Sequence, residues 1–116
     1  MTPAQGPIDL DHLNQYTGGD RAVNYEVLRL FQEQCATMLA RLEALAAGDG
    51  AGGKIWKETA HTLKGAARGV GASEVAGIAA DMERISGDSA AAVASVQRLK
   101  AQIAIVNGFV DELLKE

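Results

Sequence analysis

The sequence predicts an all-α protein, folded as an antiparallel up-down-up-down four-helix bundle with a short N-terminal leader helix. Alanine is abundant and the 116 residues include only 2 prolines, a composition that favours helices. Apolar residues recur at three- and four-residue spacing along four long segments, as on the buried face of an amphipathic helix. The connections between these segments are short, which makes neighbouring helices antiparallel.

The chain is long enough for one domain with a single core. Residues 1–7 are rich in proline and glycine, and we predict a disordered lead there. Residues 8–116 are expected to form the bundle domain. The leader helix can be capped by Asp9 or Asp11, and the pair Gly18-Gly19 ends it.

Four long helices follow the leader, the first of them capped by Asp20. Their predicted limits are residues 21–47, 54–69, 73–86 and 89–114. Apolar spacing places these residues of the first and last long helices inward: Val23, Val27, Leu30, Phe31, Cys35, Met38, Leu42 and Leu45, and Val93, Val96, Leu99, Ile103, Val106 and Val110.

Composition excludes several classes of protein. A net charge of −4 and a pI of about 5.1 argue against nucleic-acid binding, which depends on a basic surface. No apolar run approaches the roughly 20 residues that cross a bilayer, and no signal peptide is recognisable, so we expect no membrane partner. The single cysteine, Cys35, forms no internal disulfide, which fits a cytoplasmic protein.

The most informative residue is His61, in the helix predicted over residues 54–69. At about 100° per residue, His61 lies about 160° from the apolar residue Leu63, so its ring faces solvent. Gly65 lies one turn further on, about 40° from His61. A glycine inside a helix costs roughly 0.5–1 kcal/mol relative to alanine, and here it leaves space above the imidazole for a large partner.

Cations surround this histidine. Four of the eleven basic residues fall between positions 54 and 68, on the outer half of the helix: Lys54, Lys57, Lys64 and Arg68. A basic patch on an acidic protein suits a group that will carry an anion. An exposed histidine in a lysine-rich face is more commonly a solvated surface, but that interpretation does not explain Gly65.

The run Ala60-His61-Thr62-Leu63-Lys64-Gly65, followed by Gly71, resembles the motif of the histidine-containing phosphotransfer (HPt) domain. The family pattern is A-H-x-L/I-K-G with a glycine six residues later, and the chain departs from it at Arg68, where many members have a small residue. The resemblance implies that His61 accepts a phosphoryl group on its distal ring nitrogen. Lys64 and Arg68 would neutralise phosphoryl oxygens, Gly65 would give clearance, and the expected docking residues also include Lys57, Val70 and Ile78.

The resemblance implies a phosphorelay intermediate that takes the phosphoryl group from a receiver-domain aspartate of a hybrid kinase or response regulator and passes it to another. Such a protein is a phosphocarrier without an ATP site or a cofactor of its own, and Mg²⁺ is expected in the partner receiver. We expect a monomer. The chain begins with methionine and ends at a helix end, which favours a free-standing protein.

Alternatives remain open at the level of sequence. One is the phosphoacceptor domain of a chemotaxis-type histidine kinase, and another is a non-catalytic helical bundle for protein interaction. A kinase dimerisation helix would place an acid directly after the histidine, where this chain has Thr62. Asp9, Asp11 and His12 could imitate a metal cluster, but acids at a helix start are typically caps, and we predict no metal site. The kinase, the regulator and the pathway are not specified by the sequence.

Overall fold

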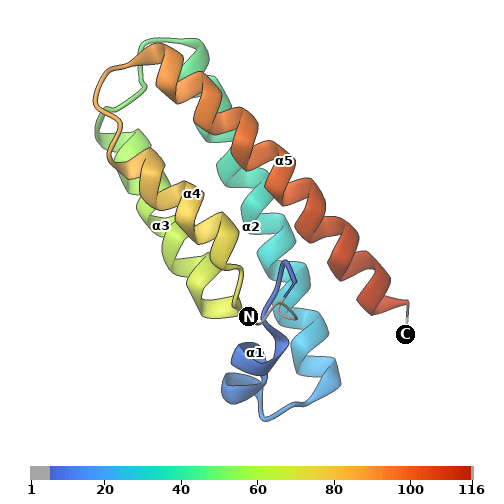
Figure 1. Cartoon of the computed structure of the whole chain (residues 1–116). Coiled ribbons are helices and arrows are strands. Elements are labelled where there is room, and N and C mark those ends of the chain that lie inside the picture. The colour runs from blue at the N-terminus through green and yellow to red at the C-terminus, as the bar shows by residue number, and fades with distance from the viewer. Residues whose placement is uncertain (1–5, 116) are drawn as a thin grey trace.

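The structure, a computed structural model, describes residues 6–115, and residues 1–5 and 116 lie outside the description. The described residues form five helices and no strand, which confirms the all-α class (Figure 1). The helices are α1 (Leu10–Thr17), α2 (Arg21–Ala47), α3 (Lys54–Val70), α4 (Ser73–Glu83) and α5 (Ser89–Leu114). Most of the predicted disordered lead falls outside the described residues, and residues 6 and 7 form a turn.

The long helices pack side by side in a ring. Helix α2 contacts α3 and α5, and α4 also contacts α3 and α5, so each of the four has two neighbours (Figure 1). The short α1 lies against α2 and α3 at one end of an elongated molecule of 43 × 29 × 21 Å. This arrangement leaves the outer face of α3 open to solvent along its length.

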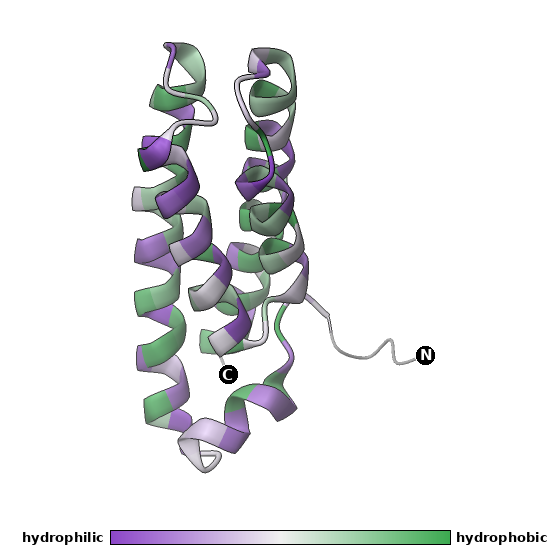
Figure 2. Ribbon diagram, turned by 90° about the vertical axis from the view of Figure 1, so that its left-hand side faces the viewer, coloured by the Kyte–Doolittle hydropathy of each residue, from purple (hydrophilic) through white to green (hydrophobic). Residues whose placement is uncertain are grey.

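The core fills the space between the helices with aliphatic residues and two aromatic side chains, Trp56 and Phe31, which are both fully buried. Hydrophobic and hydrophilic positions alternate along each of the long helices (Figure 2). In α2 the buried positions are Leu28, Phe31, Cys35, Leu42 and Ala46. Three predicted core residues are instead exposed: Val23 by 43%, Leu30 by 54% and Val93 by 43%. The prediction was wrong there because three-and-four spacing admits more residues than one contact stripe can bury, and Leu28 takes the inward position instead of Leu30.

Helix starts agree closely with the sequence. The carboxylates of Asp9, Asp20 and Asp88 each accept a hydrogen bond from the backbone N–H three residues on, at 3.1, 3.1 and 3.0 Å. These are N-cap bonds, which satisfy donors that the first helical turn leaves unpaired. Asp9 and Asp11, which were considered with His12 as a metal cluster, have different structural roles, since Asp9 caps α1 and Asp11 lies in its first turn.

Helix α4 ends earlier than predicted, at Glu83 instead of near Ser86. Helix α3 ends at Val70, and its C-cap is Gly71, whose φ of 83° is the left-handed conformation that glycine adopts without strain. A Cβ at this position would lie 2.7 Å from the backbone oxygen of Asp9, so the glycine of the motif also permits α1 to approach. Only residues 71 and 72 separate α3 from α4, which sets the two helices as a tight hairpin.

Candidate functional site

His61 lies on the solvent face of α3. Its side chain is 69% exposed, whereas Ala60, Leu63 and Ala67 on the opposite face are fully buried. The predicted exposure of the imidazole is therefore confirmed. A partner can approach the ring without any rearrangement of the bundle.

Gly65 lies one turn beyond His61 and has no packing function among the described residues. A Cβ built on this glycine meets no atom within 4 Å outside its own helix. Alanine would therefore fit and would favour the helix by roughly 0.5–1 kcal/mol. Packing within the described chain does not account for the glycine, which leaves the helix surface beside the imidazole open.

A residue that the sequence analysis did not select, Glu83, completes the site. One carboxylate oxygen, Oε2, lies 3.0 Å from Nδ1 of His61, and the other, Oε1, lies 2.5 Å from Nζ of Lys64. The two basic groups come from adjacent turns of α3, and the carboxylate comes from the last residue of α4. The three side chains form a hydrogen-bonded group that we call the His61–Glu83–Lys64 triad.

The charge state of Glu83 sets the tautomer of His61. The hydrogen bond from Lys64, assisted by that from His61, lowers the pKa of Glu83 below its ordinary value. Glu83 is then ionised at neutral pH, and an ionised carboxylate only accepts hydrogen bonds. The proton of the neutral imidazole consequently lies on Nδ1, and Nε2 keeps a free lone pair.

Sequence contained a signal for Glu83 that helical periodicity alone does not use. His61 precedes Gly71 by ten positions, and Glu83 follows Ala72 by eleven, so a hairpin with a two-residue connection places them side by side.

The other predicted site residues are distributed unevenly around the triad. Nζ of Lys57 lies 3.3 Å from the backbone oxygen of Glu83. Arg68 lies two turns beyond His61 on the same face, exposed, and the structure gives it no ion pair with any residue in the range 6–115. Val70 and Ile78 are each only 7% exposed, so the expectation that they contribute to docking was wrong.

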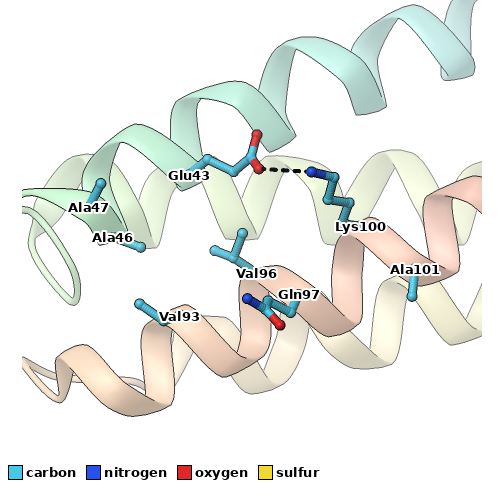
Figure 3. Close-up of a pocket in the computed structure, with 8 residues that line it drawn as sticks. All are labelled: Glu43, Ala46, Ala47, Val93, Val96, Gln97, Lys100 and Ala101. Atoms are coloured by element: carbon cyan, nitrogen blue, oxygen red, sulfur yellow. Dashed lines mark ion pairs between the residues drawn. The ribbon is translucent and has the colours of Figure 1, made fainter.

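An open groove lies elsewhere, between α2 and α5 (Figure 3). Its volume is about 670 Å³, its walls are mostly alanine and valine, and an ion pair of 3.7 Å joins Glu43 to Lys100 at its edge.

Burial raises the pKa of the Cys35 thiol to about 12, which keeps this possible nucleophile protonated. No group of three or more His, Cys, Asp or Glu side chains in the described range could hold a metal ion.

A family model for the Hpt domain matches residues 26–108, which is most of the chain. The protein therefore belongs to the Hpt domain family, whose members transfer phosphoryl groups on histidine in the phosphorelays of two-component signalling and interact there with receiver domains. Searches of curated proteins and of solved structures returned no match. None of the helices in the described part of the chain has the length and apolar character needed to span a membrane.

Proposed function

We propose that this protein is a phosphorelay intermediate in which His61 accepts a phosphoryl group from a receiver-domain aspartate and passes it to the aspartate of a response regulator. The observation that carries the proposal is the exposed imidazole whose Nδ1 is bonded to Glu83. That bond presents the Nε2 lone pair to solvent as a nucleophile. The family assignment supports the same reaction class.

In the proposed step, Nε2 of His61 attacks the phosphorus of the aspartyl phosphate in line with the leaving oxygen. The N–P bond forms as the O–P bond breaks, and the electron pair of the broken bond returns to the aspartate as a carboxylate. The ring becomes a phospho-imidazolium, with its proton still on Nδ1. Glu83 stabilises the positive charge that develops on the ring, because its carboxylate is already in place before the reaction begins.

The neighbouring residues take separate roles in this proposal. The ammonium of Lys64, which pairs with Glu83, lies one turn from the imidazole. During transfer it turns partly away from Glu83 and neutralises the incoming phosphoryl oxygens. Gly65 leaves room for the receiver surface. Arg68 acts at the edge of the interface through long-range attraction, and Lys57 acts through Glu83 and not on the phosphoryl group.

The protein is proposed to work as a cytoplasmic monomer without a cofactor of its own, and Mg²⁺ is expected in the receiver. The up-down-up-down order is also part of the proposal. It is supported by the hydrogen bonds that link the first half of α2 to the end of α5, from Gln32 to Asn107 and from Tyr25 to the carbonyl of Leu113.

The test is transfer from a panel of purified, phosphorylated receivers to the protein, with the phosphorylated nitrogen identified by NMR. The proposal expects phosphate on Nε2 of His61 from at least one receiver, and its return to a second receiver. Phosphorylation by an ATP-bound kinase domain but by no receiver would favour the phosphoacceptor domain of a chemotaxis-type kinase. Absence of both reactions would favour an interaction bundle.

A further inference from the structure

The position of Glu83 depends on how the end of α4 is held, because Glu83 is the last residue of that helix. The final carbonyls of a helix lack intrahelical partners, and last turns fray unless something else bonds them. A frayed last turn would move the Glu83 carboxylate away from Nδ1 of His61. In α4 the backbone N–H groups of Arg84 and Ile85 donate to the carbonyls of Asp81 and Met82, at 3.1 Å each, which closes the last turn on itself. The triad still needs a device that fixes this turn against α3.

The first turns of α3 supply that device. The indole Nε1 of Trp56, a fully buried residue, donates a hydrogen bond of 2.7 Å to the backbone oxygen of Met82. The ammonium of Lys57 donates to the next carbonyl, that of Glu83, at 3.3 Å. Two consecutive side chains of α3 thus bond the last two carbonyls of α4, one from inside the core and one from its surface.

A third contact fastens the segment that follows α4. Gly52, just before α3, has a φ of 78°, and a Cβ on it would lie 2.3 Å from the backbone nitrogen of Gly87. The loop before α3 and the loop after α4 therefore touch backbone to backbone. The end of α4 is held against the start of α3 at three successive points.

We propose that Trp56 is a positioning residue for phosphotransfer. Its indole N–H, supported by Lys57, fixes the end of α4 so that Glu83 holds the Nδ1–H tautomer of His61. This inference rests on the proposed function for its consequence on rate, but its structural part concerns the unphosphorylated protein alone. Trp56 lies five residues before His61, and packing alone would explain its burial. In this proposal it also acts on the reacting nitrogen, through the Met82 carbonyl and the Glu83 carboxylate.

The chain offers a clean test because Trp56 is its only tryptophan. Expression in a tryptophan auxotroph supplied with benzothienylalanine replaces the indole N–H by sulfur and keeps the ring size. We expect the ¹⁵N shifts of His61 to move away from the Nδ1–H tautomer. The single-turnover rate of transfer should fall about fivefold, as for a lost hydrogen bond of about 1 kcal/mol.

Two sets of variants separate positioning from general stability. Val110→Ala removes buried volume from α5, lowers stability, and should leave the His61 tautomer and the transfer rate unchanged. Lys57→Met should shift the tautomer in the same direction as the sulfur analogue, to a smaller extent, and Lys57→Arg should restore it because a donor returns.

Two results would overturn the inference: wild-type ¹⁵N shifts in the benzothienylalanine protein, or an equal shift in Val110→Ala. A wild-type protein that no receiver phosphorylates contradicts the proposed function instead. In that case the tautomer measurement, made without any phosphoryl donor, still decides whether Trp56 positions Glu83.

Discussion

The α3–α4 face and the α2–α5 face both carry polar contacts between helices, but they are organised differently. On α2 and α5 the contacts are spread over several residues. Gln32 donates to Asn107 and Asp111 at 3.2 and 3.3 Å, Arg29 pairs with Asp111 at 3.6 Å, and Glu43 pairs separately with Lys100 at 3.7 Å. On α3 and α4 three basic groups converge on one residue, Glu83, through its two carboxylate oxygens and its carbonyl. Convergence of this kind is what sets a tautomer and orients a ring.

The 670 Å³ groove belongs to the α2–α5 face, which carries neither of the two histidines. The α2–α5 groove is lined mainly by small apolar residues, and its ion pair is exposed, a type worth about 0–1 kcal/mol. His61 in contrast stands on an open surface. In the proposed reaction the histidine meets the aspartate of another folded domain, so it needs an accessible ring and no deep pocket.

The largest expected effect is at His61 itself. His61→Gln should abolish phosphate acceptance and leave the fold intact, because the side chain is exposed and only one hydrogen bond is lost. The measurement is acid-labile phosphate after incubation with a phosphorylated receiver, with helicity by circular dichroism. His12→Gln is the control and should transfer normally; acceptance by the His61 variant would refute the site.

Gly65→Leu should come next, with transfer reduced on the order of 100-fold, since the added side chain occupies the space through which the receiver reaches the ring. Helical content should stay the same or rise. Gly108→Leu is a matched control on α5, where an added Cβ also meets no atom within 4 Å. It should gain helix propensity without loss of transfer. Equal rates in the two variants would show that Gly65 does not provide access.

The sequence predicted the parts of this molecule that depend on local patterns. The cap at Asp20, the start of the last helix at Ser89, the exposure of His61 and the open position at Gly65 follow from capping preferences, turn residues and helical rotation. Glu83 required the register between two helices, and rotation within one helix does not contain that information. The exposure of Leu30 likewise depends on which neighbouring helices cover α2. Apolar spacing alone therefore predicted a buried Leu30, although no neighbouring helix covers that position.

Glu83→Gln tests the triad directly. The amide keeps the shape of the side chain but loses the charge that stabilises the phospho-imidazolium, and it no longer requires the proton on Nδ1. We expect transfer to slow about tenfold, for about 1.4 kcal/mol of lost stabilisation at the transition state. Glu43→Gln, which breaks the ion pair of the opposite face, should leave the rate unchanged. A rate loss at Glu43 of similar size would remove the distinction between the two faces.

Lys64 and Arg68 are expected to divide catalysis and docking between them. Lys64→Ala should lower the single-turnover rate by up to about tenfold and barely change affinity for the receiver, because its ammonium acts on charge that forms at the transition state. Arg68→Ala should mainly reduce the association rate and its dependence on salt. Stopped-flow association and quenched transfer measure the two quantities separately. The opposite pattern would exchange the roles of the two cations.

The smallest expected effect is on stability, and it depends on pH. The pKa of Glu83 in the folded protein is lowered from its ordinary value of 4.5, first by the hydrogen bond from Lys64. A depressed carboxyl pKa stabilises the fold above the ordinary value and ceases to do so as pH falls through the folded value. The stability advantage of wild type over Glu83→Gln should therefore be constant near neutrality and shrink below about pH 4.5. Urea midpoints measured between about pH 3 and 7 test this. Lys64→Ala should remove most of the pH-dependent difference, because it removes the main cause of the shift; if the difference persists in that variant, Lys64 is not the residue that keeps Glu83 ionised.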